Sequence, residues 1–239
     1  MNPGILQGIG IGPGDPELIT VKALRYLQAA PVVAFPAGRS GQPGVAERAI
    51  ASWLRPHQTR LPLDFPYVQD PEVLSAAWSA AAHRVWPHLQ QGNVVFASEG
   101  DISFYSTFSY LARSLQQLHP TATIEAVPGI CSPLAAAAVL GQPLTLQSQR
   151  LAVIPALYAP QQLAEVLPWA DVVVLLKVAS VYGQVWQLLK QHQLLQRSYV
   201  VQHATTPHQI VYADLSNHPH LKLPYFSLLI VHVRPCVLE

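Results

Sequence analysis

A glycine-rich segment near the start of the chain could bring its backbone close to a ligand. Gly8–Asp15 has glycine at alternate positions, so the Cβ atoms that would hold a ligand away are missing there. The spacing is not that of a dinucleotide-binding GxGxxG loop, because the last place falls on Pro13 counted from Gly8 and on Asp15 counted from Gly10. A Walker loop is also excluded, since no Gly-Lys-Ser/Thr follows. The segment is expected either to offer backbone N–H groups to carboxylates beside a helix N-terminus or to be a tight strand-to-helix turn.

A pair of carboxylates forms a second candidate group. Glu99–Gly100–Asp101 follows the short apolar run Asn93–Ser98, which is typical of a strand covered on both faces. Two carboxylates at the end of a buried strand are costly unless they cap a helix or hold a ligand. Their charge would suit a sulfonium cation or ribose hydroxyls, with Asp101 as the preferred ligand group. The alternative is that one of them caps the helix expected over Tyr105–Leu118.

A third group begins where another expected strand ends. Val127–Ser132 combines a strand end, a sharp turn at Pro128–Gly129 and two small polar side chains that open an alanine-rich helix. Close packing of that helix is the competing interpretation.

Apolar periodicity predicts strands and helices in alternation along the whole chain. This order is typical of parallel βαβ units and predicts an α/β fold of two domains, 1–119 and 120–239, divided near the polar stretch His119–Thr123. Ligands of such sheets lie beyond the carboxyl ends of the strands, so chemistry is expected in six loops. These loops follow Ile11, Phe35, Ser98, Val127, Leu176 and Gln202.

Composition limits the partners. Only 11% of the 239 residues are charged, against about 25% in an average protein, and the formal net charge is +1. No broad basic field for nucleic acid is therefore expected. No apolar run approaches the roughly 20 residues of a spanning helix, and no leader is evident, so a cytoplasmic protein without membrane contact is expected. Cys131 and Cys236 have the spacing of neither a disulfide framework nor a metal site.

Several motifs, taken in order, resemble those of the tetrapyrrole (corrin/porphyrin) methylases. They are GIGIGPGDPELITVKALRYLQAAPVVAFPAG, ASEGDISFY, VPGICSPLAAAAVLGQPL, VVVLLKV, HATTPHQIV and PYFSLLIV, and the likeness around them extends from Ile5 to Val231. Within the family, EGDISFYSTFSYLAR, the pairing of LLKV with HATTP, and PYFSLLIV are similar to the branch that methylates precorrin-2 at carbon 20.

The resemblance implies a homodimer of two-domain α/β chains, each with S-adenosylmethionine in the cleft between its domains. It implies methylation of precorrin-2 at carbon 20 in cobalamin biosynthesis, with S-adenosylhomocysteine as product. Two positions depart from the family: Ile102 stands where many members have proline, and Ala204 where relatives often have glycine. By position, the methyl donor should contact Pro13, Gly100, Asp101, Phe104, Cys131, Ser132, Lys177 and Ala204.

The acetate and propionate groups of a tetrapyrrole require hydrogen-bond donors. The expected substrate positions are Gly12, Gly14, Asp15 and Arg39, with Lys22, Arg60, Arg113, Arg150 and Lys177 as further candidate cations. His203 could accept the proton lost from the ring carbon, and Tyr105 could form a wall for the ring. Either could equally be structural.

Three alternatives remain at the level of sequence. A nucleotide-cofactor oxidoreductase is disfavoured by the missing glycine fingerprint. A non-catalytic tetrapyrrole-binding module would have kept these motifs without turnover. A neighbouring methylase could act on cobalt-factor II at carbon 20, on another precorrin or uroporphyrinogen, or on RNA, and the weak charge speaks against RNA.

Overall fold

The computed structural model describes residues 3–38, 42–66, 68, 70–155 and 161–234, which form two compact units. The first unit extends to Cys131 and the second starts at Ser132. The expected boundary between 119 and 120 is therefore too early. The reason is that β5 (Thr123–Val127) pairs with β1 (Ile5–Gly10) and completes the first sheet.

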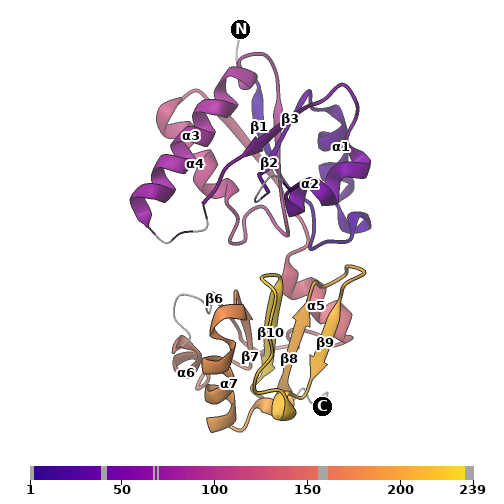
Figure 1. Cartoon of the computed structure of the whole chain (residues 1–239), viewed down its shortest axis with the longest axis vertical. Coiled ribbons are helices and arrows are strands. Elements are labelled where there is room, and N and C mark those ends of the chain that lie inside the picture. Colours follow the sequence, from indigo (N-terminus) through magenta and orange to yellow (C-terminus); the bar gives the residue numbers. More distant parts are fainter. Residues whose placement is uncertain (1–2, 39–41, 67, 69, 156–160, 235–239) are drawn as a thin grey trace. The chain divides into compact units, whose positions relative to one another are not determined.

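The first unit is a parallel sheet with helices on both faces. Its strand order is β3-β2-β4-β1-β5, with β2 at Val32–Pro36, β3 at Thr59–Leu63 and β4 at Val94–Ser98, and every pairing is parallel. Figure 1 shows α3 and α4 on one side of the sheet and α1 and α2 on the other. These helices span Pro71–Leu89, Phe108–Leu118, Val21–Ala29 and Val45–Ile50.

Strand β4 explains why both faces are covered. All five of its residues are buried, and alternate side chains point to opposite faces. Val94 and Phe96 pack in the core beneath α3 and α4, whereas Val95 and Ala97 pack beneath α1 and α2. A continuous apolar run is what a strand buried on both faces requires.

The second unit contains a mixed sheet, which corrects the expectation of parallel strands throughout. Its strand order is β6-β7-β10-β8-β9, and β10 runs antiparallel to both β7 and β8. The strands are β6 (Leu151–Pro155), β7 (Val172–Leu176), β8 (Ser198–Gln202), β9 (Ile210–Ala213) and β10 (Ser227–His232). Because β7 and β8 are both antiparallel to β10, they run in the same direction, and their carboxyl ends lie at the same end of the sheet.

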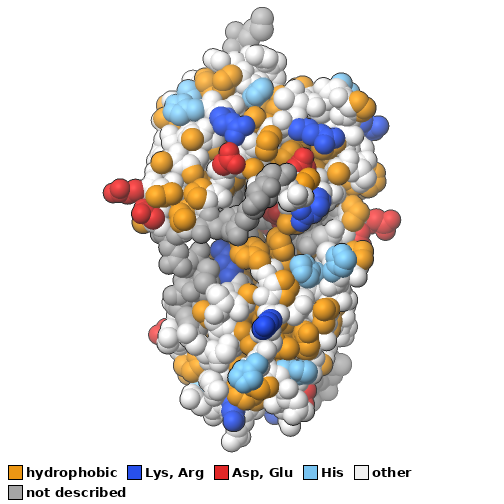
Figure 2. Space-filling view, viewed as in Figure 1, with side chains coloured by type: hydrophobic (Ala, Val, Ile, Leu, Met, Phe, Trp, Pro, Cys, Tyr) orange, Lys and Arg blue, Asp and Glu red, His pale blue; other side chains and the backbone are white. Residues whose placement is uncertain are grey.

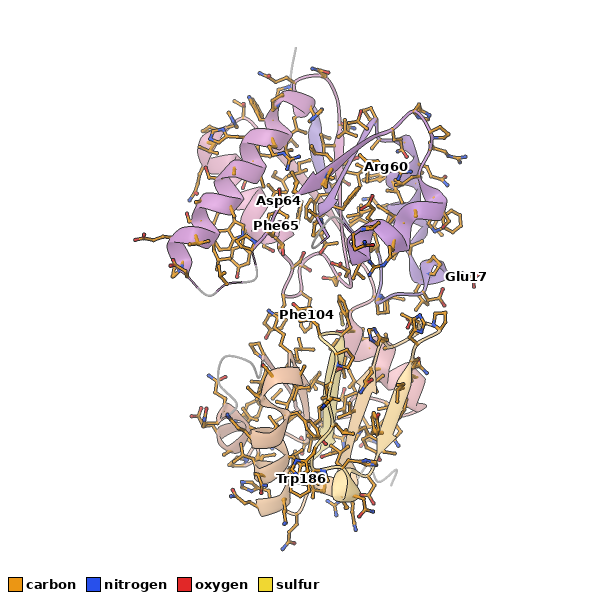
Figure 3. All side chains as sticks on the ribbon, in the orientation of Figure 1. Glu17, Arg60, Asp64, Phe65, Phe104 and Trp186 are labelled. Atoms are coloured by element: carbon orange, nitrogen blue, oxygen red, sulfur yellow. The ribbon has the colours of Figure 1, made fainter. Side chains whose placement is uncertain are left out.

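The helices of the second unit cover this sheet. Helix α5 (Ser132–Leu140) packs against β10, while α6 (Gln162–Val166) and α7 (Tyr182–Gln191) share a core with the sheet. Trp186, marked in Figure 3, donates its indole N–H to the Leu215 carbonyl at 2.8 Å. The Tyr182 hydroxyl donates to the His218 carbonyl at 2.7 Å. These two bonds tie α7 to the turn that leads toward β10.

Several local features differ from the sequence-based expectation. The edge strands β3 and β9 were not predicted, because exposed residues interrupt their apolar pattern. Helix α4 starts at Phe108 rather than Tyr105, since Tyr105 has φ 53°, which is not helical. Helix α3 continues through Pro87 to Leu89. No helix within the described residues is long and apolar enough to cross a membrane.

Two side-chain caps follow the glycine-rich segment. Asp15 Oδ1 accepts the Glu17 N–H at 2.9 Å and begins a short 3₁₀ turn at Pro16–Leu18. Thr20 Oγ1 accepts the Ala23 N–H at 3.3 Å and caps α1. Both residues therefore act as caps, each for its own helical turn.

Buried His232 makes the stability of the second unit depend on pH. Only 7% of its surface is exposed, and its Nδ1 has no hydrogen-bond partner among the described residues. Burial lowers the pKa of His232, because the charged imidazolium is poorly solvated there. At mildly acidic pH, His232 therefore binds a proton in the unfolded chain but not in the folded chain. The free energy of unfolding falls as pH drops below the unfolded pKa of about 6.5.

We expect His232→Phe to weaken this acid sensitivity. Denaturant unfolding at about pH 7.5 and about pH 5.5 should show a smaller loss of unfolding free energy in the variant than in the wild type. His192→Gln, at an exposed histidine, should keep the wild-type difference. Equal pH dependence in all three proteins would rule out His232 as the cause.

Candidate functional site

Three strand ends of the first unit meet through backbone contacts between glycines. A Cβ placed on Gly129 would lie 2.4 Å from the Gly100 carbonyl oxygen and 2.8 Å from Gly10 Cα. A Cβ on Gly10 would lie 2.6 Å from the same oxygen. Only glycine permits this approach, so the ends of β1, β4 and β5 close on one another.

A two-residue bridge extends this contact. Gly12 N–H donates to the Gly100 carbonyl at 3.2 Å, and Gly100 N–H donates to the Gly12 carbonyl at 2.7 Å. Gly12 and Gly100 have φ values of 80° and 68°, in the left-handed region that favours glycine. The loops after β1 and β4, both expected to carry chemistry, are therefore hydrogen-bonded to each other.

Asp101 ties the loop after β4 to the loop after β5. Its Oδ1 accepts the Ser103 N–H at 2.9 Å and the Ser103 hydroxyl at 2.6 Å, and its Oδ2 accepts the Gly129 N–H at 2.8 Å. Partial burial raises the pKa of Asp101, but the hydrogen bonds from Ser103 and Gly129 outweigh it and lower the pKa overall. The carboxylate therefore stays negative at neutral pH.

Glu99 has a different partner from its neighbour. Its Oε1 accepts the Ala46 N–H at 3.0 Å, in the first turn of α2. Burial raises the pKa of Glu99, although this backbone hydrogen bond opposes the shift. Of the two carboxylates, Glu99 is thus the one that caps a helix, and that helix is α2 rather than α4.

The remaining predicted residues of the first unit flank this edge. Phe104, marked in Figure 3, and Tyr105 follow β4, and their rings meet edge to face at 4.9 Å between centroids. Tyr105 is 51% exposed. Pro13 and Gly14 lie in the loop after β1, and Cys131, half-buried, follows β5. Arg39 lies outside the described residues.

Two of the candidate cations are already held in ion pairs. Lys22 Nζ lies 2.9 Å from Glu125 Oε1 on β5. Arg150 Nε lies 3.5 Å from Asp171 Oδ2, and Asp171 also accepts from Arg234 at 2.9 Å. Arg60, marked in Figure 3, is an exposed residue of the edge strand β3. On the face drawn in Figure 2, the Lys and Arg side chains are scattered and form no broad basic patch.

Three of the predicted residues of the second unit lie at the carboxyl ends of its strands β7 and β8. Lys177 follows β7, and His203 and Ala204 follow β8. Lys177 and His203 have φ values of 55° and 46°, which are unusual for residues with a side chain. Such strain often accompanies functional sites, because the surrounding structure must hold it in place. Ser132 begins α5 in this unit.

The strand register shows how these residues relate to β10. Leu176 pairs with Leu228 and Gln202 pairs with Ser227, so Lys177 and His203 flank the start of β10. The sequence analysis did not single out Tyr225 or Phe226 at that start, although PYFSLLIV contains them. Among the described residues, no group of three or more His, Cys, Asp or Glu could hold a metal ion.

We expect Gly129→Ala to destabilise the first unit. The new methyl group would overlap the Gly100 carbonyl and Gly10 backbone, at a cost of about 2 kcal/mol or more. Gly183→Ala is the matched control, since its Cβ position in α7 has no atom within 4 Å apart from its chain neighbours and the backbone of its own helix. Thermal unfolding should show a lower midpoint for Gly129→Ala and an equal or higher one for Gly183→Ala. A Gly129→Ala midpoint at the wild-type value would contradict the close contact.

Asp101→Asn should destabilise the same edge more than Ser103→Ala does. The amide places an N–H group where a carboxylate oxygen accepts hydrogen bonds, at a cost of about 1.5 kcal/mol, whereas Ser103→Ala removes one hydroxyl bond worth about 1 kcal/mol. Denaturant unfolding of both variants measures the order. A larger loss in Ser103→Ala would show that the bond to Gly129 contributes little.

Comparison with known proteins assigns the family. The model of the Tetrapyrrole (Corrin/Porphyrin) Methylases matches residues 6–217. The chain is 32% identical over 231 residues to the cobalt-precorrin-2 C(20)-methyltransferase of Salmonella typhimurium, covering 96% of each chain. It is 31% identical over 237 residues to the precorrin-2 C(20)-methyltransferase of a Sinorhizobium species, covering 95% of each.

A longer relative and a solved structure complete the comparison. The cobalamin biosynthesis protein CobIJ of Mycobacterium bovis is 36% identical over 239 residues, and the chain spans 45% of its length. A uroporphyrin-III C-methyltransferase of Thermus thermophilus, solved with S-adenosylhomocysteine, has a TM-score of 0.66 and 24% identity, covering 95% of this chain and 97% of that one. This last likeness concerns the fold alone. The family match over most of the chain and the two α/β units agree with the expected fold class, and the chain belongs to the tetrapyrrole methylases.

Proposed function

We propose that the chain is an S-adenosylmethionine-dependent methyltransferase that acts on carbon 20 of precorrin-2 in cobalamin biosynthesis. The observation that carries the proposal is the carboxyl end of the first sheet, where Gly12 pairs with Gly100 through the backbone and Gly129 donates its N–H to the ionised Asp101. The full-length relatives that carry the C(20)-methyltransferase name support the position on the ring.

The residues at this edge fit a sulfonium nucleotide. Asp101 keeps a negative charge near neutral pH, which complements a cation. A Cβ placed on Gly100 would meet only Cys131 Cα, at 4.0 Å. The proposed donor contacts of the first unit are Pro13, Gly100, Asp101, Phe104 and Cys131. Those of the second unit are Ser132, Lys177 and Ala204.

The chemistry demands alignment more than a strong enzymic nucleophile. Bound S-adenosylmethionine would supply an already activated methyl group, and good alignment alone can be worth about 7–11 kcal/mol. Because both oxygens of Asp101 accept hydrogen bonds from its own unit, its chief work is to hold Gly129 and the Ser103 turn in place. Its charge would act on the donor from that fixed position.

Substrate recognition and proton removal are assigned by position. Backbone groups of Gly14 and Asp15, together with Arg39, would bind the acetate and propionate groups. The remaining expected substrate position, Gly12, already donates its N–H to Gly100 and would hold the loop in place. His203 is the candidate acceptor for the ring proton, and Tyr105, half exposed, is the candidate wall for the macrocycle. A cytoplasmic homodimer is part of the proposal.

A second candidate substrate is cobalt-factor II. The Salmonella relative carries a cobalt-precorrin name, and its identity of 32% is close to the 31% of the relative named for metal-free precorrin-2. The relatives therefore support both substrates to a similar degree.

The decisive assay is mass spectrometry of products made with isotopically labelled S-adenosylmethionine. We expect one labelled methyl group on precorrin-2, placed at carbon 20 by NMR, with less product from cobalt-factor II. The reverse preference would assign the cobalt route. Labelling of uroporphyrinogen III alone, or of no tetrapyrrole despite S-adenosylhomocysteine binding, would overturn the proposed function.

A further inference from the structure

Two aromatic residues stand at the start of β10, between the ends of β7 and β8. Tyr225 and Phe226 precede Ser227, and their rings meet edge to face with centroids 5.1 Å apart. The Phe226 ring also lies 6.2 Å from the His203 ring. Phe226 is 37% exposed and Tyr225 is 52% exposed. These two side chains are called the aromatic wall below.

The aromatic wall is held by a rigid backbone. His203 N–H donates to the Phe226 carbonyl at 2.8 Å, which extends the pairing of β8 with β10 by one residue. The His203 carbonyl in turn accepts from the N–H and hydroxyl of Thr206, at 3.0 and 2.9 Å. His203 keeps its left-handed backbone because these bonds lock the turn. These bonds fix the backbone of Phe226 beside the turn at His203.

The position of the wall points to the methyl donor. Lys177 flanks the start of β10 on one side and His203–Ala204 on the other, so two positions expected to contact the donor lie on either side of Phe226. Neighbouring strands are about 4.8 Å apart, which places the ends of β7 and β8 roughly 10 Å from each other with the wall between them. That span suits one planar heterocycle.

We propose that Phe226, supported by Tyr225, packs against the purine base of S-adenosylmethionine. The inference rests on the proposed function and adds a contact to the base at two residues that are not among the donor positions above. Aromatic side chains stack on nucleic-acid bases favourably, and such a contact removes apolar ring surface from water on both partners. Phe226 thereby recognises the base, while the alignment of the methyl group depends on other residues.

The test is isothermal titration of the full chain with S-adenosylhomocysteine and, separately, with adenosine. Phe226→Ala should raise the dissociation constant for S-adenosylhomocysteine about tenfold, which corresponds to about 1.4 kcal/mol. It should weaken adenosine binding by a similar factor, and Phe226→Leu should lie in between. Circular dichroism and thermal unfolding verify that each variant folds.

Trp169→Ala is the matched control. Trp169 is an aromatic residue, 43% exposed, that precedes the amino-terminal end of β7, at the opposite end of the strands from Phe226. A five-residue strand separates the two ends by about 16 Å. This variant should bind both ligands like the wild type.

The outcomes separate the inference from the proposed function. Unchanged S-adenosylhomocysteine affinity in folded Phe226→Ala and Phe226→Leu would overturn the role of the wall while the wild type still binds. A variant that binds the nucleotide normally but has a raised KM for the tetrapyrrole would assign the wall to substrate, which also overturns the inference. Failure of the wild type to bind S-adenosylhomocysteine would instead overturn the proposed function.

Discussion

The geometry of the first unit depends on one constraint, the direct backbone contact among Gly10, Gly100 and Gly129. Any side chain at Gly10 or Gly129 would push apart the ends of β1, β4 and β5. With glycine there, the loops after these strands are close enough for the Gly12–Gly100 bridge and for the bond from Gly129 to Asp101. The candidate binding region at the carboxyl ends of these strands therefore depends on three residues that have no side chain.

The second unit reaches a comparable edge by a different route. Its antiparallel strand β10 lies between β7 and β8, so their carboxyl ends stand on either side of its start. Lys177 and His203 turn sharply there with positive φ, and backbone bonds fix the turn at His203. At the other end of β7, Asp171 binds Arg150 and Arg234 and anchors the strand. In this unit, hydrogen bonds fix the turn at His203 and ion pairs anchor the opposite end of β7. In the first unit, glycine packing positions the strand ends.

Much of the fold followed from sequence pattern where burial is complete. The apolar run Asn93–Ser98 predicted a strand covered on both faces, and the alternation of strands with helices predicted the α/β class. The pattern failed at edges: β3 and β9 expose most of their residues and show no clear apolar period. The direction of β10 was also missed, because parallel and antiparallel strands differ in their partners rather than in their own residues.

The sequence by itself determined which residues could do chemistry and the family to which their order points. It could not decide what each carboxylate does. Glu99 and Asp101 are separated by one residue, yet one caps α2 and the other holds the Gly129 loop. Nor could it reveal that Phe226 lies beside His203, which precedes it by many residues along the chain. Only the tertiary structure settles such questions, because hydrogen-bond partners and ring contacts come from strand pairing between distant segments, which local sequence does not encode.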